Sequence, residues 1–271
     1  MLNREEYVEQ AYMFKSLMER MSANEPIQEI LGYVREEILS TTKLPMAIDF
    51  LLSEVKRIGT MATAMKQLSH YFTPFQSFMI STAEEERGQF DMRIALQLLQ
   101  HEAKLRSEIT DPVPVFFYQF ETLCRHSLDY DYGLQAIAND PIYDQQWHHW
   151  ILSVRHKLGL VEIADMVYLH SDHYLKRKQE HEAAPEVVLF GEREGRIALA
   201  NRKKDPHYLF LALQRQLGYP PVPVRQKGDG MTELIPKLKK AIERLEVRVK
   251  MLEDEQRNQG IDLSRFYKGK K

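Results

Sequence analysis

The chain has 271 residues, of which 44% are hydrophobic and 28% are charged, and its formal net charge is -2. This length and composition are typical of a folded globular protein with a large core, and they exclude an intrinsically disordered chain. The small net charge excludes a strong overall field that would draw the protein to nucleic acid or to an anionic membrane. A single cysteine, Cys124, excludes an intramolecular disulfide framework.

The N-terminus and the cysteine content indicate the compartment. The first residues are acidic and resemble a helix, and they lack the apolar stretch and small-residue cleavage pattern of a secretory signal. No run approaches the roughly 18 apolar residues that a membrane span requires. One cysteine suits a reducing compartment. We therefore expect a cytoplasmic protein with no membrane partner.

The first part of the chain predicts one helix after another. Asn3 and Glu6 have the spacing of a capping box, which predicts a helix start. Pro26 is expected to begin a second helix, because proline suits the first helical turn. A third helix is predicted over residues 46–71, with Gly59 as its weak point.

Prolines also predict where later helices begin. Thr73 and Pro74 are expected to be the N-cap and first residue of a long helix, which Gly88 bends or divides. A strongly apolar helix with three phenylalanines follows the break at residues 111–114, and we expect it at the centre of the fold. Asp140, which precedes a proline, is predicted to open another helix.

The periodicity weakens after residue 160. Residues 166–169 and 187–190 are short β-prone runs that we expect to pair as a small hairpin-like sheet, although a helix stays open for the first run. Gly191 and Gly195 are expected to form a turn between strand and helix. This pattern predicts a module distinct from the helical domain before it.

The predicted fold class is mainly α, with a multi-helix domain, a small α+β or irregular module and a terminal amphipathic, coiled-coil-like helix. In the second module, Asp205 is expected to cap a helix that ends at Gly218. The expected parts are a helical domain over residues 1–160, the α+β module over residues 161–219, a linker over residues 220–230, the amphipathic helix over residues 231–259 and a basic tail over residues 260–271.

The terminal helix carries a heptad seam. Its a positions are Ile or Val and its d positions are Leu, a combination that favours a two-stranded parallel coiled coil. The seam has only the minimum length for a coiled coil, and neighbouring apolar residues widen it toward the apolar face of a globular helix. Packing of this helix on its own chain and docking to another protein therefore stay open as alternatives. We expect a homodimer. The seam residues are Ile235, Leu238, Ile242, Leu245, Val249 and Leu252.

Histidines supply an alternative function, a metal-dependent enzyme. His149 and His156 are seven residues apart and share a helical face, and His170, Asp172 and His173 add three potential ligands within four residues. A zinc or manganese site can be assembled from these side chains. The chain has no His-Glu-x-x-His sequence and no zinc-type cysteine pair, and hydrogen-bonded histidines explain the pattern more simply.

The C-terminal tail supplies a second alternative, binding of RNA or of an acidic partner. Residues 265–271 carry four basic side chains beside Phe266 and Tyr267, which suit phosphate contact and base stacking. A solvated terminus is the simpler interpretation, so we do not expect a nucleic-acid partner.

Other reactive groups receive structural interpretations. Cys124 lies in an apolar run and is expected to be a buried, inert thiol. The acidic residues 84–86 are spread around a helix and are expected on a solvated face. The chain has neither Gly-x-Ser-x-Gly nor Gly-x-x-x-x-Gly-Lys, and we expect no cofactor.

Three stretches carry a family resemblance: residues 35–50 (REEILSTTKLPMAIDF), 70–76 (HYFTPFQ) and 195–206 (GRIALANRKKDP). They resemble an uncharacterised family of planctomycete-type bacterial proteins to which no activity is attached. The resemblance implies a bacterial, cytoplasmic protein and assigns no catalytic or binding residue. From the seam we expect a non-catalytic assembly or adaptor protein that self-associates through its C-terminal helix and offers a groove to a protein partner.

Overall fold

The computed structural model describes residues 2–23, 25–85, 90–157, 161–177 and 187–224. In these residues it contains thirteen α-helices and no strand, so the predicted mainly α class is confirmed. The chain divides into two compact units, Met1–Val224 and Arg225–Lys271. The described residues all belong to the first unit. The seam, the basic tail and most of the predicted linker lie outside them.

The first unit is a succession of helices of 6 to 18 residues. Short connections join most of them, as is usual when consecutive helices are neighbours in space. In chain order they are α1 (Arg4–Met21), α2 (Ile27–Glu37), α3 (Leu44–Ile58), α4 (Met61–Gln67), α5 (Pro74–Glu84), α6 (Met92–Glu108), α7 (Pro112–His126), α8 (Tyr130–Ala138), α9 (Gln145–Lys157), α10 (Ile163–Leu169), α11 (Asp172–Arg177), α12 (Glu192–Ala200) and α13 (Pro206–Leu217).

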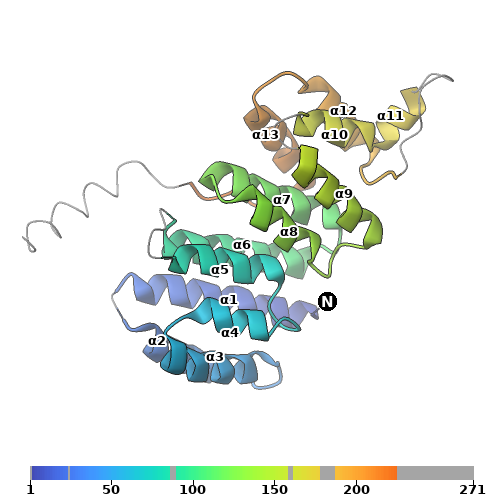
Figure 1. The fold of residues 1–271 in the computed structure, drawn as a ribbon. Helices are drawn as coiled ribbons and strands as arrows, with labels where there is room; N and C mark the ends of the chain where they lie inside the picture. Colours follow the sequence, from blue (N-terminus) through green and yellow to red (C-terminus); the bar gives the residue numbers. More distant parts are fainter. Residues whose placement is uncertain (1, 24, 86–89, 158–160, 178–186, 225–271) are drawn as a thin grey trace, which may run out of the picture. The chain divides into compact units, whose positions relative to one another are not determined.

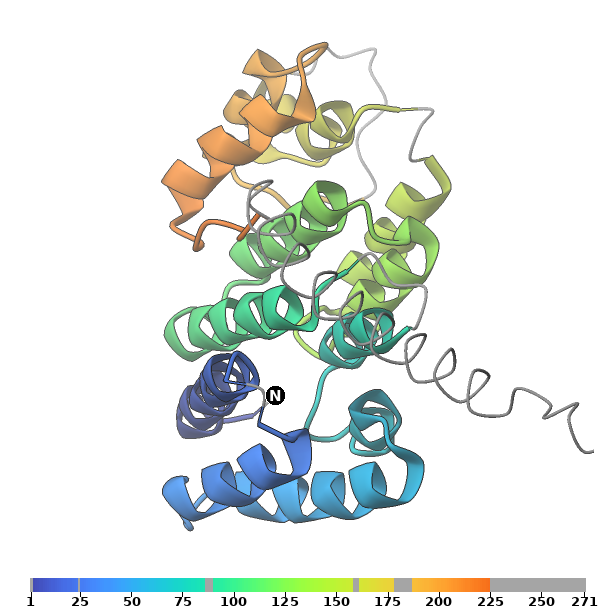
Figure 2. The same cartoon turned by 90° about the vertical axis from the view of Figure 1, so that its left-hand side faces the viewer.

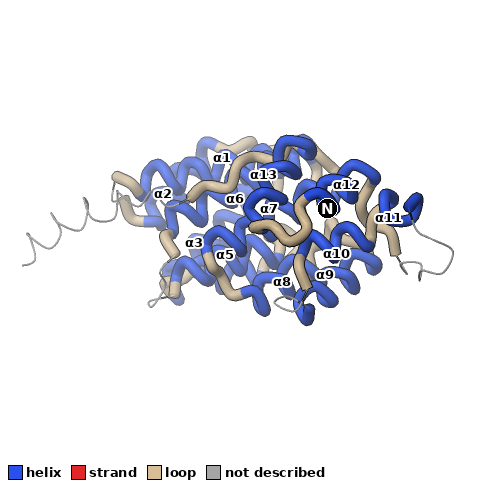
Figure 3. The backbone as a smooth tube through the Cα atoms, turned by 90° about the horizontal axis from the view of Figure 1, so that it is seen from above, coloured by secondary structure: helices blue, strands red, loops and turns tan. Residues whose placement is uncertain are grey.

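The helices of this unit stack in successive layers (Figure 1). From one end, α2 packs on α1, α1 lies along α6, α6 contacts α7, and α7 contacts α13. Figure 2 shows the same succession from the side, with α10–α13 at the end opposite α2 and α3. Seen from above in Figure 3, α1, α6, α7 and α13 follow one side, while α3, α5, α8 and α9 follow the other. Apolar side chains between the two sides form one continuous core.

Helix α7 is the central element, as its phenylalanines predict. Residues 113–123 are all buried, so this helix meets protein on every side. Phe116 and Phe120 stack with their ring centroids 5.7 Å apart, and Phe116 also meets Trp147 and Trp150 of α9. Despite this burial, none of the helices in the described ranges is both long enough and apolar enough to cross a lipid bilayer.

Helix α1 begins where the sequence predicts, but its capping box does not form. The Asn3 side chain makes no cap hydrogen bond. The Glu6 carboxylate instead accepts from the Lys43 amide at 2.8 Å and from the Tyr71 hydroxyl at 2.7 Å. Glu6 is 4% exposed, so it contacts these distant partners in the interior and not its own helix start.

Two predicted long helices are each divided in two. Gly59 ends α3 in the left-handed conformation, with φ at 86°, and its N–H bonds to the Val55 carbonyl at 2.9 Å. The helix predicted over residues 46–71 is therefore α3 and α4. The next predicted helix is α5 and α6, and Gly88 lies between them outside the described residues.

Three other predicted helix ends are confirmed. Thr73 and Gln76 form a complete capping box at the start of α5. The Asp205 side chain accepts from the His207 amide at 2.8 Å and so caps α13. Gly218 ends α13 in the left-handed conformation, with φ at 72°.

The prediction that Asp140 opens a helix is wrong. Helix α9 begins at Gln145, five residues later. Asp140 is 1% exposed, and its carboxylate pairs with the guanidinium of Arg106 and accepts from the Ile142 amide at 3.2 Å. The aspartate that resembles an N-cap in the sequence is instead the acceptor for a buried arginine.

The hairpin-like sheet expected after residue 160 does not form. Residues 166–169 lie inside α10, which is the helix left open for that run, and a parallel bridge joins Ser171 to Phe190. The extended run that ends at Phe190 inserts that ring against Trp147 and Trp150, at centroid distances of 5.3 and 5.0 Å. This run thus contributes the buried ring of Phe190 to the core and does not form a sheet.

Gly195 lies inside α12 and not in the expected turn. A side chain does not fit at this position, because the segment of residues 171–173 approaches the helix closely. A Cβ at Gly195 would lie 2.5 Å from Ser171 Cβ and 2.8 Å from His173 Cβ. Gly195→Ala is therefore expected to lower the free energy of unfolding by about 1–3 kcal/mol through overpacking, measured by urea unfolding followed by circular dichroism.

Gly32 in α2 is the matched control, because a Cβ there meets nothing within 4 Å. Gly32→Ala is expected to raise the free energy of unfolding by roughly 0.5–1 kcal/mol, since alanine favours a helix interior. Equal effects of the two substitutions would contradict the close packing at Gly195.

Candidate functional site

A groove of about 740 Å³ opens between α5 and α8, with the C-terminal end of α4 beside it. Its volume is within the roughly 300–1,000 Å³ of ligand-binding pockets. Helices α5 and α8 contact each other beneath it. The lining residues are Lys66, Ser69, Phe72, Pro74, Ser77, Phe78, Ser81, Thr82, Glu85, Asp129, Tyr132, Gln135, Ala136 and Asn139.

The lining combines an apolar base with polar walls. Phe72 is 1% exposed and Phe78 is half-buried, whereas Tyr132 is 66% exposed at the opposite wall. Seven neutral hydrogen-bonding side chains line the groove, four of them hydroxyls of Ser or Thr. The Lys66 ammonium donates to Ser81 Oγ at 3.3 Å, so the cation is held at one wall.

A carboxylate fixes the wall formed by α4 and α5. The two oxygens of Glu84, at the end of α5, accept from the amides of Met61 at 2.6 Å and Ala62 at 3.0 Å. These amides begin α4, where Thr60 provides no side-chain cap. The sequence interpretation of residues 84–86 as a solvated face missed this role, because the two helix ends are more than twenty residues apart.

The opposite wall, α8, is fixed at both ends. Asp129 caps its start by accepting from the amides of Asp131 at 2.8 Å and Tyr132 at 3.1 Å. At Gly133 the helix approaches α7, since a Cβ there would lie 2.7 Å from a methyl group of Leu123. Beyond its C-terminal end the chain turns inward at Asp140.

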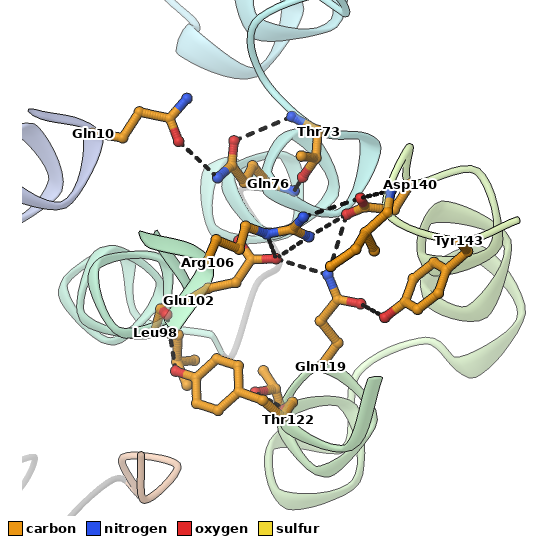
Figure 4. Close-up of polar contacts among 12 residues, drawn as sticks. Gln10, Thr73, Gln76, Leu98, Glu102, Arg106, Gln119, Thr122, Asp140 and Tyr143 are labelled. Carbon is orange, nitrogen blue, oxygen red and sulfur yellow. Dashed lines mark hydrogen bonds and ion pairs between the residues drawn. The ribbon is translucent and has the colours of Figure 1, made fainter. Parts of the chain in front are cut away.

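A buried ionic cluster holds that inward turn (Figure 4). The Arg106 guanidinium pairs with Glu102 at 2.9 Å and with both oxygens of Asp140. Gln119 of α7 donates to Glu102 at 2.7 Å and accepts from the Tyr143 hydroxyl at 2.8 Å. The side chains of Arg106, Glu102 and Asp140 are fully buried. The cluster ties α6, α7 and the turn after α8 together.

The electrostatics keep Arg106 charged. Burial alone would lower the pKa of Arg106, but the carboxylates of Asp140 and Glu102 raise that pKa well above its usual range. Burial also raises the pKa of Tyr143, so its hydroxyl stays a donor. Removing the cation would leave two carboxylates buried together without a countercharge.

A second buried cluster joins α1 to α5. The Gln76 side chain donates to Gln10 at 3.2 Å (Figure 4). The Gln10 amide donates to the Tyr71 carbonyl at 3.2 Å. Both glutamines are completely buried. This polar contact fixes α5, the helix that forms the first wall of the groove, against the N-terminal helix.

The side chains proposed as metal ligands lie in two groups, one on α9 and one where α10 meets α11. His149 and His156 are exposed on α9, and His170 Nδ1 lies 2.8 Å from the Met166 carbonyl at the end of α10. Asp172 begins α11, and His173 Nε2 is buried without a hydrogen-bond partner. Across the residues that the structure describes, no group of three or more His, Cys, Asp or Glu side chains is arranged to hold a metal ion.

Cys124 is held as a thiol. Burial raises the pKa of Cys124 to about 11, and the side chain is hydrogen-bonded to Tyr130. Since the thiolate is the reactive form, the raised pKa makes this thiol a weaker nucleophile near neutral pH, although the side chain is partly buried and not fully buried as the sequence predicts.

Two basic residues that precede the tail form ion pairs with acidic side chains. Arg202 pairs with Asp165 and lies over the Tyr168 ring, 5.5 Å from its centroid, and Lys176 pairs with Glu192. The tail itself and the seam residues, Ile235 to Leu252, lie outside the described residues.

No family model, curated protein or solved structure matches the chain. Function is therefore inferred from the groove and its supports.

The buried cluster gives a direct test of the groove's support. Arg106→Met is expected to lower the free energy of unfolding by about 3–5 kcal/mol, because it leaves Glu102 and Asp140 uncompensated. Arg57→Gln removes a surface ion pair with Glu54 and is expected to leave the free energy of unfolding nearly unchanged. Chemical unfolding of both variants makes the comparison, and similar losses would show that the buried cluster is no more important than a surface pair.

Proposed function

We propose that the chain is a cytoplasmic, non-catalytic adaptor protein that binds a short extended segment of a partner protein in the groove between α5 and α8. The observation that supports this proposal is the lining: seven neutral hydrogen-bonding side chains above an aromatic base. An extended peptide carries alternating N–H and C=O groups that need such partners.

The chemistry of the lining suits a peptide backbone. Hydroxyl and amide side chains both donate and accept, so the exposed side chains of Ser69 and Gln135 suit either backbone group. Phe78, which is half-buried, offers apolar surface to a side chain of the peptide. Tyr132 stands exposed at the rim, and tyrosine is enriched in protein interfaces.

The rigidity of the walls also supports binding. Glu84 fixes α4 against α5, and Arg106 fixes the turn after α8 through Asp140. A groove whose walls are held in place loses less conformational entropy on binding. The adaptor's specificity would then depend on the peptide's fit between these helices.

We further propose that the protein self-associates through the heptad seam of residues 235–252. The seam has Ile or Val at a and Leu at d, which favours a parallel pair of helices. Two copies would present two grooves to one partner, and two linked sites raise the overall affinity.

Peptide display tests the groove. Heptapeptides are selected on the immobilised full-length chain, and the enriched peptides are titrated against wild type and Ala136→Arg. Ala136 lies on the α8 wall, where an arginine side chain fills the groove. The variant is expected to lose at least about tenfold in affinity, or about 1.4 kcal/mol.

Gln28→Arg is the matched control, because it adds the same side chain on the exposed face of α2. It is expected to bind the peptides as wild type does. Peptides that bind Ala136→Arg as tightly as wild type, or a selection that enriches none, would overturn the proposed groove function.

Light scattering tests the self-association. One chain has a mass of 31.9 kDa, and the full-length protein is expected to have twice that mass in solution. The double variant Leu238→Lys with Leu245→Lys is expected to be a monomer, because it places charges at d positions. A chain ending at Lys227 retains the compact unit Met1–Val224 and is expected to be monomeric. Equal protomer numbers in all three would exclude pairing through the seam.

A further inference from the structure

The proline-rich segment 219–224, whose residues 220–224 the sequence predicts to be part of a linker, is packed against α6 and α7. Tyr219 is 2% exposed and Val222 is 6% exposed. The Tyr219 hydroxyl lies 2.8 Å from Glu121 Oε2 of α7 and 3.1 Å from the Phe210 carbonyl. This segment is therefore fixed to the body of the unit at its first residue.

Two histidines hold the carbonyl groups of the same segment. His126 Nε2, at the end of α7, lies 2.8 Å from the Pro223 carbonyl oxygen, and the His101 ring of α6 is hydrogen-bonded to the backbone of Pro221. Proline has no N–H, so its backbone can only accept. Each ring must therefore donate an N–H, which fixes the tautomer of both histidines.

Protonation of the rings is unfavourable while the segment is bound. His101 Nδ1 is buried without a hydrogen-bond partner, so a proton there would be an unsatisfied buried donor. The neighbouring charges are Lys104 near His101 and Arg125 near His126, and both repel an imidazolium.

The other groups that face this region do not offset that repulsion. The Glu121 carboxylate is already paired with Arg125 at 2.5 Å and with the Tyr219 hydroxyl. The Phe90 ring meets His126 at a centroid distance of 5.3 Å. The hydrogen bonds to Pro221 and Pro223 favour the protonated rings, but burial, the largest cause, outweighs them and lowers the pKa of both histidines. The bound segment thus favours neutral rings.

We propose that His101 and His126 form a pH-responsive clamp that holds residues 219–224 on α6 and α7 near neutral pH and releases them on acidification. The clamp controls where the chain leaves the first unit toward residues 225–271. This inference does not depend on the groove between α5 and α8.

The sign of the pH dependence follows from linkage. Burial is the main cause that lowers the pKa of both His101 and His126 in the clamped state. After release the rings return toward the ordinary value of about 6.5. The released state then binds more protons, so the clamp is fully stable above about pH 6.5 and weakens as the pH falls below it.

Hydrogen exchange of the full chain between pH 5.0 and 7.5 tests the clamp. Peptides that cover residues 219–224 report the amides of Tyr219, Val222 and Val224. After correction for the intrinsic rate, their exchange is expected to rise about fivefold or more from pH 7.5 to 5.0, while residues 113–123 of α7 stay protected. The proposal would be overturned if the protection of residues 219–224 did not change over this pH range. It would also be overturned if residues 219–224 and α7 lost their protection together.

Glutamine variants separate titration from hydrogen bonding. His101→Gln with His126→Gln keeps an N–H donor at both sites and cannot titrate, so the segment is expected to stay protected at pH 5.0. His101→Ala with His126→Ala removes both donors and is expected to exchange fast at every pH. His149→Gln, on the exposed face of α9, is the control and keeps the wild-type profile. A double glutamine variant whose segment exchanges as fast at pH 5.0 as that of wild type would contradict the clamp. If the double variant does not fold, the single glutamine variants make the same comparison.

Discussion

The pairing of Arg106 with Glu102 and Asp140 is the interaction on which the central part of the structure depends. Three charged side chains lie fully out of water, and each would be costly there alone. Because the guanidinium must meet both carboxylates, α6 and the turn after α8 have one permitted arrangement. Gln119 extends the same requirement to α7. The cluster therefore specifies how helices from distant parts of the chain meet, whatever its net contribution to stability.

This specification reaches the groove through short connections. Asp140 follows Asn139, which lines the groove, so the carboxylate that pairs with Arg106 also sets the end of the α8 wall. On the other wall, Glu84 replaces the missing side-chain cap of α4. Both walls are thus positioned by carboxylates that act across the fold. A groove built in this way keeps its width because charge and hydrogen bonding, and not only apolar packing, hold its sides.

The sequence predicts the features that local chemistry decides. The caps at Thr73 and Asp205 form as expected, because the second contact of Gln76, to Gln10, uses its amide N–H and leaves its oxygen to the Thr73 amide. Asn3 with Glu6 has the same spacing, but Lys43 and Tyr71 take the carboxylate. Asp140 has the appearance of an N-cap, yet a buried arginine takes it. The groove itself could not be predicted, since its walls are far apart in the chain and only packing brings them together.

Composition predicts that residues 220–224 belong to a linker, but they are part of the first compact unit. Prolines remove backbone donors, which in water favours an extended and unattached chain. In the folded unit the same lack of donors makes the carbonyls of Pro221 and Pro223 good partners for side chains that donate, and His101 and His126 supply them. Tyr219 and Val222 add apolar burial. Residues 219–224 therefore belong to the fold because α6 and α7 place two imidazoles where the prolines offer only acceptors. Burial makes this contact favour neutral imidazoles, so it is sensitive to pH in the range where histidine titrates.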